Sequence, residues 1–436
     1  MQKIGLLIII GLFPSILFSQ TKLSGKLTAD VVNNVIQLLN DNYVYPDTAL
    51  KMGNFLSKQL KNGAYANVSK LQDLSDLINR DLNSVHHDGH LQLQYNPQSA
   101  AAFSNPVENT TTRIDPLKRI RDVNFGLSKV ENLNGNIGYL NISRFWADDI
   151  EGRETLKGAL KFLRHSNAII IDVRNCGGGS PETVKMICGY FLEKKTHLND
   201  SYSRPANETT EYWTVPDTSF RDLTKMPLYV LCSNGTFSAA EEFCYDLKNL
   251  KRATIIGEQT GGGAHNTFER PVVNGFVLYI PYGRAINPIT KTNWEKVGVS
   301  PDVEVTASKA LETAEMMIFE NLLMNTTDAS EKFDLNWQLD LLKAINNPVV
   351  IDEQTLMKYA GVYEQRTFTF ENGKLYYQRT GKPKFELEAM TKTMMKGKGN
   401  TYFKIEFIEN AGGVIDEVKA YYQDNRIEIS KRSNRE

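Results

Sequence analysis

The sequence has little that would point to a metal, a redox centre or nucleic acid. Only 4 of its 436 residues are cysteine, and no C-x-x-C or C-x-x-C-H pattern occurs, so zinc-finger, thioredoxin-like and haem-attachment sites have no support. Its 50 basic and 51 acidic side chains give a formal net charge of -1 and no basic stripe for a phosphate backbone. Nucleic acid is therefore not an expected partner, and neither a metal nor another cofactor is implied.

One long apolar run stands out, at the start of the chain. The first twenty residues, MQKIGLLIIIGLFPSILFSQ, contain one lysine and then an apolar run from Ile4 to Phe18 that is short for a membrane span. This predicts a signal peptide at residues 1–20 and an exported, periplasmic or extracellular protein that is not held in the membrane after cleavage. A buried N-terminal strand or helix is the alternative. Phe18 and Gln20 do not match the small-x-small rule, so the cleavage position stays open.

Export would place the chain in an oxidising space, where disulfides form. Yet its cysteines lie inside apolar runs rather than at the spacings of a disulfide framework; they are Cys176, Cys188, Cys232 and Cys244. We therefore expect four free, buried thiols.

The length of the chain predicts two or three domains. Residues 21–96 contain three amphipathic patterns with apolar side chains every three or four positions, which predict a small N-terminal helical bundle. We expect these helices to be a scaffold with no chemistry of their own. Residues 97–118 are polar and rich in Asn, Thr and Pro, so we interpret them as a linker.

Strand and helix patterns alternate in residues 119–330. NAIIIDV is a continuous apolar run, typical of a strand covered on both faces, and a helical pattern follows that starts at Pro181. LYVLC, an amphipathic helix and ATIIGE repeat this order, which predicts an α/β layer structure. A hairpin is predicted at Asn274-Gly275, because both residues favour a left-handed turn.

The last part of the chain has a different pattern. Residues 331–351 predict a helical connection. Residues 352–436 consist of short strands and turns, such as TFTFENGKLYYQR, and predict a small C-terminal antiparallel β domain, either a barrel or a sandwich. We assign no catalytic residue to this domain.

Ser238 stands where a turn gives way to a helix, in NGTFSAAEEFCYDL. Ser238 and Glu241 have the spacing of a capping box, so a structural role alone would explain this serine. A nucleophile is the other interpretation, since Ser238 follows a buried strand and an Asn234-Gly235 turn at the carboxyl edge of the sheet, where α/β sites form. There the first N–H groups of the helix have no intrahelical partner and point at a developing oxyanion.

A glycine run in DVRNCGGGSP, residues 172–181, forms a second junction between a buried strand and a helix. Glycine permits close approach of the backbone, so N–H groups of this run could converge on a carbonyl oxygen. A flexible turn is the alternative. Neither G-x-x-x-x-G-K-[ST] nor G-x-G-x-x-G fits the run, which argues against a phosphate loop.

A serine nucleophile needs a base, and NSVHHDGHLQLQY contains the histidine cluster of the chain, His86, His87 and His90. His90 opens the alternating strand HLQLQY, which would fix its direction better than a loop fixes the other two. With Asp88 the three histidines could instead bind a metal, or form a polar loop. No H-E-x-x-H motif accompanies them.

These motifs resemble a known family. The segments that carry the resemblance are VHHDGHLQLQY, SNAIIIDVRNCGGGSPETV, LYVLCSNGTFSAAEEFCYDLKNLKRATIIGEQTGGGAHN and GRAINPITKTNWEKVGVSPDVEV. Together they are similar to the C-terminal processing peptidases, also called tail-specific proteases, in the branch of interphotoreceptor retinoid-binding protein and the tricorn protease core. The resemblance covers roughly residues 25–325 and implies a crotonase/ClpP-like α/β core with serine peptidase activity.

The resemblance also implies roles for individual residues. The serine nucleophile falls on Ser238, and the oxyanion donors fall on the N–H groups of Ala239 and Gly178. The tricorn-like arrangement places its histidine base at His90 and its orienting carboxylate at Glu295.

The chain departs from the family pattern in two places. The lysine base of the tail-specific branch falls on Gly263, so a Ser-Lys dyad is absent. The serine that precedes the histidine in the tricorn-like arrangement falls on Gly89, so its hydrogen bond is missing. Without the resemblance, Glu295 would be taken for a surface glutamate beside Lys296.

Two functions remain for comparison. The first is a serine-type peptidase that hydrolyses peptides or unfolded proteins through an acyl-enzyme on Ser238. The alternative is a non-catalytic binding module for apolar ligands or peptides, similar to the retinoid-binding relatives; the joint presence of Ser238, His90 and Glu295 argues against it. A crotonase-type acyl-CoA enzyme would need a cytosolic cofactor, which the signal segment disfavours.

Overall fold

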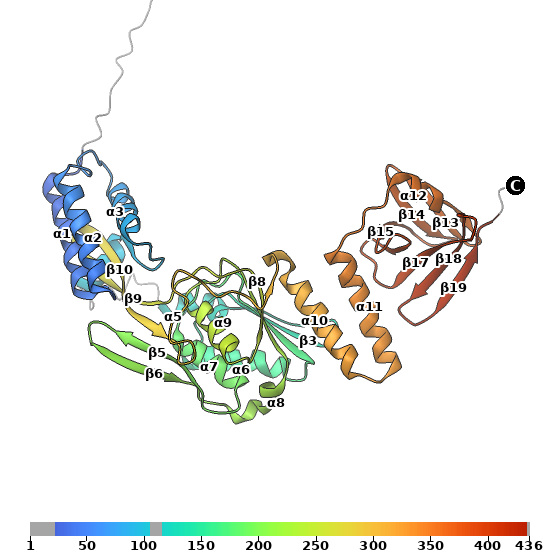
Figure 1. Ribbon diagram of the computed structural model, residues 1–436, viewed down its shortest axis with the longest axis horizontal. Coiled ribbons are helices and arrows are strands. Elements are labelled where there is room, and N and C mark those ends of the chain that lie inside the picture. Colours follow the sequence, from blue (N-terminus) through green and yellow to red (C-terminus); the bar gives the residue numbers. More distant parts are fainter. Residues whose placement is uncertain (1–21, 105–115, 434–436) are drawn as a thin grey trace, which may run out of the picture. The chain divides into compact units, whose positions relative to one another are not determined.

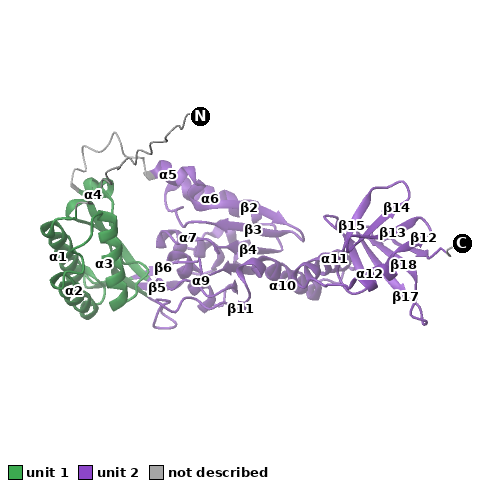
Figure 2. Ribbon diagram, turned by 90° about the horizontal axis from the view of Figure 1, so that it is seen from above, with its two compact units in different colours: residues 1–113, 201–210, 265–285 green, residues 114–200, 211–264, 286–436 purple. Residues whose placement is uncertain are grey.

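The computed structural model describes residues 22–104 and 116–433, and the chain divides into two compact units (Figure 2). Unit 1 comprises residues 1–113, 201–210 and 265–285, and unit 2 comprises the remainder. The predicted signal peptide, residues 1–20, lies outside the described residues. Element labels follow Figure 1. No described helix combines the length and apolarity needed to cross a bilayer.

Unit 1 begins with the three helices that the amphipathic patterns predict, and Pro46 occupies the first turn of the second. The helices are α1 (Gly25–Asn42), α2 (Pro46–Lys61) and α3 (Leu71–Val85), followed by the short α4 (Pro97–Ser104). An antiparallel sheet completes the unit, in which β1 and β9 both pair with β10. These strands are β1 (Gln92–Tyr95), β9 (His265–Val272) and β10 (Phe276–Ile286).

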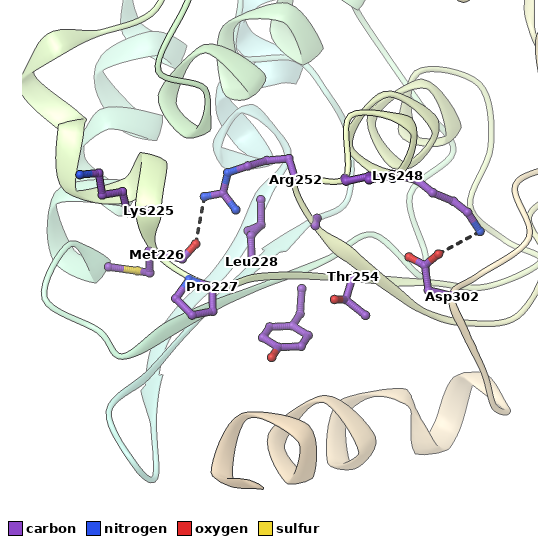
Figure 3. Close-up of a pocket in the computed structure, with 11 residues that line it drawn as sticks. Lys225, Met226, Pro227, Leu228, Lys248, Arg252, Thr254 and Asp302 are labelled. Carbon is purple, nitrogen blue, oxygen red and sulfur yellow. Dashed lines mark hydrogen bonds and ion pairs between the residues drawn. The ribbon is translucent and has the colours of Figure 1, made fainter. Parts of the chain in front are cut away.

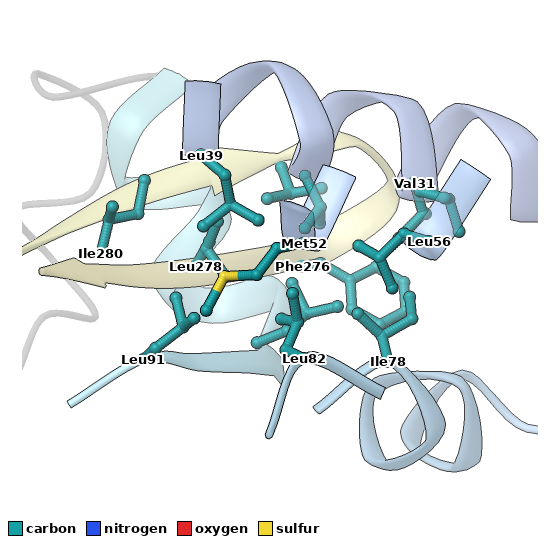
Figure 4. Close-up of a cluster of buried hydrophobic side chains, with 14 of the residues drawn as sticks. Val31, Leu39, Met52, Leu56, Ile78, Leu82, Leu91, Phe276, Leu278 and Ile280 are labelled. Carbon is teal, nitrogen blue, oxygen red and sulfur yellow. The ribbon is translucent and has the colours of Figure 1, made fainter. Parts of the chain in front are cut away.

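The core of unit 1 joins the helices to that sheet (Figure 4). Leu39 and Met52 of the first two helices pack in one buried cluster with Phe276 and Leu278 of β10. The N-terminal helices therefore do not form a bundle on their own, because strands from much later in the sequence cover their apolar faces. The predicted hairpin is present, with φ of 60° at Asn274 and 83° at Gly275.

Unit 2 contains a six-stranded sheet in the order β11-β8-β7-β4-β3-β2, in which every neighbouring pair is parallel except β2 with β3. Its strands are β2 (Leu127–Leu133), β3 (Ile137–Ile142), β4 (Ala168–Asp172), β7 (Leu228–Cys232), β8 (Thr254–Gly257) and β11 (Val303–Glu304). Every residue of β4 and β7 is buried, as their continuous apolar runs predict. The predicted α/β layer structure is confirmed.

Helices precede, connect and follow these strands, and short 3-10 turns occur in both units. The helices are α5 (Pro116–Asp122), α6 (Ile150–Leu163), α7 (Pro181–Phe191), α8 (Arg221–Lys225), α9 (Ala239–Asn249) and α10 (Ala310–Asn325), with 3-10 turns at Asn124–Gly126, Thr218–Phe220, Val273–Gly275 and Ala307–Lys309. Strands β5 (His197–Ser203) and β6 (Glu208–Trp213) contribute residues to both units. The four cysteines are free and buried, as expected.

The C-terminal part forms an eight-stranded antiparallel sheet, which confirms the predicted β domain. Its elements are α11 (Ala329–Asn346), α12 (Glu353–Tyr359), β12 (Gly361–Tyr363), β13 (Arg366–Glu371), β14 (Lys374–Arg379), β15 (Lys384–Ala389), β16 (Met394–Gly397), β17 (Phe403–Glu409), β18 (Ile415–Tyr422) and β19 (Ile427–Lys431). A bridge between Tyr363 and Arg432 links the first strand to the end of the last, so the sheet nearly closes on itself.

Candidate active site

Two loops at the carboxyl edge of the six-stranded sheet lie beside each other. One leads from β4 to α7 through the glycine run, and the other leads from β7 to α9 through Ser238. Since β4 and β7 are parallel neighbours, their following loops leave the sheet side by side. The sequence predicted these two junctions as one site.

Hydrogen bonds lock the two loops together. The hydroxyl of Thr236 donates to the carbonyl of Val173, and the hydroxyl of Ser233 donates to the carbonyl of Arg174. The N–H of Phe237 donates to the carbonyl of Cys176 at 3.0 Å. The residues that lead up to Ser238 are thus held by the backbone of the glycine-run loop.

Ser238 precedes the first residue of α9 in an unusual backbone conformation, with φ 56° and ψ -123°. A positive φ is uncommon for a residue with a Cβ, and such strain persists only where the surroundings impose it. The N–H of Ser238 donates to Oε2 of Glu241 at 2.9 Å, which is the glutamate half of the predicted capping box. The serine is partly exposed, whereas Ala239 behind it is buried.

Gly178 packs directly against this serine. A Cβ at Gly178 would lie 2.8 Å from Cβ of Ser238 and 3.0 Å from the nitrogen of Ala239, and its φ of 99° favours glycine. Among the described residues, neither the N–H of Gly178 nor that of Ala239 donates a hydrogen bond. The structure therefore brings together three of the predicted site residues, with two backbone donors beside one hydroxyl.

Glu241 connects this turn to the TGGGA segment. Its carboxylate, buried with no exposed surface, accepts hydrogen bonds from the hydroxyl of Thr260 and from the N–H groups of Gly262 and Gly263, at 2.7 and 2.8 Å. Burial raises the pKa of Glu241, although these hydrogen bonds and that of Ser238 favour the anion. From the sequence we expected this residue only to cap a helix.

Glu295 holds the next N–H group of the same segment. Its Oε2 accepts the N–H of Ala264 at 2.8 Å, and the neighbouring indole of Trp294 donates to the carbonyl of Gly263 at 2.7 Å. Glu295 is partly buried, in contrast to the exposed Lys296 beside it. Two carboxylates therefore bind three successive N–H groups, those of residues 262 to 264, and Glu295 is not a simple surface side chain.

His90 belongs to unit 1, whereas the four other predicted site residues belong to unit 2. It lies in the turn between α3 and β1. Burial lowers the pKa of His90 to about 4; the negative charge of Asp88 opposes this, and the electrostatic effect of His265 acts in the same direction as burial. His86 packs its ring near Tyr43, and the exposed His87 bonds to Asn83.

Asp88 and His265 form a buried pair that the sequence analysis did not anticipate. The side chains of both are fully buried, and Nδ1 of His265 lies 2.8 Å from Oδ2 of Asp88. Because β9 starts at His265, 177 residues after Asp88, only the tertiary fold brings the two together. The sequence offers Asp88 only as a possible metal ligand, and no motif in it points to His265.

A cavity of about 430 Å³ opens at the other edge of the sheet, beside the first residues of β7 and β8 (Figure 3). Four cationic side chains line it, Lys225, Lys248, Lys251 and Arg252. Lys248 pairs with Asp302 at 3.1 Å, and Arg252 donates to backbone carbonyls. None of the predicted site residues lines this cavity, and we assign it no part in the site.

Comparisons with known proteins identify the family of this chain. A model described as peptidase family S41 matches residues 136–305, and a model described as the N-terminal domain of peptidase S41 in eukaryotic IRBP matches residues 21–122. Together the two matches cover more than half of the chain. The chain belongs to peptidase family S41.

Relatives in this family carry protease names. The chain is 30% identical over 221 residues to carboxyl-terminal-processing peptidase 2 of Arabidopsis thaliana, covering 48% of this chain and 41% of that protein. It is 26% identical over 182 residues to the tricorn protease of Thermoplasma volcanium, covering 40% of this chain and 16% of that protein. The chain thus spans less than half the length of either relative.

Two solved structures align with part of this chain. The photosystem II D1 C-terminal processing protease aligns with a TM-score of 0.42 and 16% sequence identity, covering 65% of this chain and 94% of that chain. The tricorn protease aligns with a TM-score of 0.46 and 14% identity, covering 69% of this chain and 37% of that chain.

Proposed function

We propose that this S41 chain is a serine peptidase that hydrolyses peptides or unfolded proteins through an acyl-enzyme on Ser238. The observation that carries the proposal is the packing of Gly178 against Ser238 and Ala239. Two backbone N–H groups that donate no hydrogen bond within the described part of the chain lie beside a serine whose backbone φ is positive. A helix cap needs neither the strained serine nor the glycine behind it. Donors arranged beforehand in this way stabilise the oxyanion of acyl transfer.

In the proposed reaction, Oγ of Ser238 attacks the peptide carbonyl while His90 removes the hydroxyl proton. The N–H groups of Ala239 and Gly178 bind the oxyanion, and His90 returns the proton to the departing amine. A water molecule, deprotonated by His90, then releases the acid product and regenerates the serine. Glu295 would hold the imidazole in the tautomer that accepts the proton.

The pKa of His90 fixes the protonation state that a base needs. With a pKa of about 4, the imidazole is neutral at neutral pH, which is the form that accepts a proton. The position at which the Ser-Lys dyad has its lysine is occupied here by Gly263. The N–H of Gly263 donates to Glu241. The proposal therefore assigns the base to histidine and requires no cofactor.

We further propose that the protein acts outside the cytoplasm, in the periplasm or the medium. The apolar run of residues 4–18 supports this location. The N-terminal sequence of the protein recovered from its native source tests it; a chain that keeps its first twenty residues would contradict the proposal.

Replacing Ser238 by alanine tests the peptidase. We expect Ser238→Ala to abolish hydrolysis of a mixed peptide library and labelling by a fluorophosphonate probe, because the nucleophile contributes several orders of magnitude. Ser180→Ala is the matched control, since Ser180 occupies the same place before α7 and its side chain makes no cap hydrogen bond. Absence of labelling in the unmodified protein would reject the enzyme and favour a binding module.

A further inference from the structure

The turn that carries His90 is built around the carboxylate of Asp88. Oδ1 of Asp88 accepts the backbone N–H of His90 at 3.0 Å, and the carbonyl of Asp88 accepts the N–H of Leu91 at 3.1 Å. This is the local arrangement by which aspartate stabilises a tight turn. The residue directly before His90 is Gly89, which has no side chain to support the ring.

The other oxygen of Asp88 is fixed from two distant elements. Oδ2 accepts the hydroxyl of Tyr43 at 2.8 Å, and Nδ1 of His265 lies at the same distance. Tyr43 follows α1, and His265 begins β9. A fully buried carboxylate with three partners has no freedom to move, so the turn is tied to both the helical and the sheet layers of unit 1.

The backbone on either side of the turn is also held. Asn79 of α3 exchanges two hydrogen bonds with Leu93 of β1, each 2.8 Å long. Strand β1 in turn pairs with β10 from Gln92 onward. Only the six residues between helix and strand, 86–91, remain to be positioned, and Asp88 bonds within this turn.

We propose that Asp88, fixed by Tyr43 and His265, is the positioning residue for the imidazole of His90. The inference rests on the proposed function, in which His90 is the base. It adds that the imidazole of His90 is held in position by a buried Tyr–Asp–His network rather than by the preceding residue, Gly89.

The charges in the network support the same role. Burial opposes ionisation of Asp88, but hydrogen bonds from His265, the His90 N–H and Tyr43 hold the pKa of Asp88 below its usual value. Asp88 is therefore an anion at neutral pH. Its charge raises the pKa of His90 against the effect of burial, so it keeps the imidazole a stronger base than burial alone would leave it.

The chain offers a matched pair of variants. Tyr43→Phe removes the hydroxyl bonded to Asp88, and Tyr65→Phe removes a hydroxyl bonded to Asp81 at 2.7 Å, in the same unit and equally buried. Each variant leaves a buried carboxylate with one partner fewer, so both should lower the melting temperature by similar amounts. Only Tyr43→Phe should reduce kcat, by about 10-fold with KM little changed, because misplacing a catalytic group acts on the transition state. Equal kcat values in the two variants would overturn the inference.

Two further measurements separate this inference from the proposed function. In Asp88→Asn the amide still accepts the N–H of His90, but the charge is gone, so the pKa of His90 and the acidic limb of kcat/KM should move to lower pH. The ring signals of His90 can be assigned in NMR spectra by comparison with His90→Gln. Their pH titration should show the same decrease in pKa, and this measurement requires no substrate hydrolysis. If the fluorophosphonate probe does not label the protein, the proposed peptidase activity is rejected, but the NMR titration still tests the role of Asp88. An unchanged pKa of His90 in Asp88→Asn would overturn the inference.

Discussion

Oε2 of Glu241 accepts the N–H groups of both Ser238 and Gly263, at 2.9 and 2.8 Å. One buried oxygen thus joins the turn of the proposed nucleophile to the segment whose next N–H group is bound by Glu295. A substitution of Glu241 would therefore disturb both the turn that carries Ser238 and the segment that contains Gly263.

We expect Glu241→Gln to lower both stability and activity. The amide group would face N–H donors, leaving at least one of them unsatisfied at a cost of about 1 to 3 kcal/mol. Thermal unfolding and the rate of fluorophosphonate labelling measure the two effects. Glu182→Gln, at a half-exposed first-turn glutamate of α7, is the control and should change neither. Labelling of Glu241→Gln at the normal rate would contradict this prediction.

Gly178→Ala should remove activity while the protein still folds. The new Cβ would meet Cβ of Ser238 at 2.8 Å, so either the serine or the donor loop has to shift, and a shift near 1 Å costs roughly 100-fold in rate. Gly158→Ala in α6 is the matched control, because a Cβ there meets nothing within 4 Å. The control should stabilise the helix by up to about 1 kcal/mol. Peptide hydrolysis and thermal melts compare the pair, and full activity in Gly178→Ala would remove it from the oxyanion site.

Glu295→Gln should reduce kcat by about 100-fold or more, since the neutral amide cannot stabilise an imidazolium. The amide oxygen can still accept the N–H of Ala264, so little stability should be lost. Lys296→Gln provides a control at the adjacent exposed position. Steady-state kinetics of both variants test this, and equal kcat values would show that Glu295 has no part in orienting the base.

The pH dependence follows from His90. Its folded pKa of about 4 lies below the ordinary value of 6.5, so the unfolded chain binds the proton first as the pH falls. Stability should therefore decrease between about pH 6.5 and 4, and kcat/KM should stay high until the pH approaches 4. Melting temperatures of the unmodified protein and of His90→Gln over this range isolate the effect. An acidic limb of kcat/KM near pH 6.5 would show that His90 is not shielded as the structure indicates.

The sequence predicts those parts of the fold that are encoded locally. Continuous apolar runs such as residues 168–172 identify the buried parallel strands, and Asn274-Gly275 identifies the hairpin, because each pattern has a local physical cause. The sheet that completes unit 1 could not be predicted, since nothing near the helices signals that residues 265–285 pair with β1.

The site divides in the same way. Ser238 and the glycine run are visible because each follows a buried strand, and the structure places them in contact. The partners of Glu241 and Asp88 are not visible, since Gly262 and Gly263 contribute backbone groups and His265 lies far along the chain. The roles of Ser238, His90 and Glu295 in catalysis stay predictions.

Unit 1 is built from three separate segments of the chain, so it cannot complete its fold until the last of them has been synthesised. Helix α3 ends about 190 residues before β10 begins, an interval that a ribosome takes roughly 10 to 40 s to translate. Throughout that time the apolar faces of the first three helices lack their sheet, so the amino-terminal region stays unfinished and open to chaperones. A fragment that ends before residue 285 would lack part of this sheet and would leave apolar side chains of the three helices exposed to solvent.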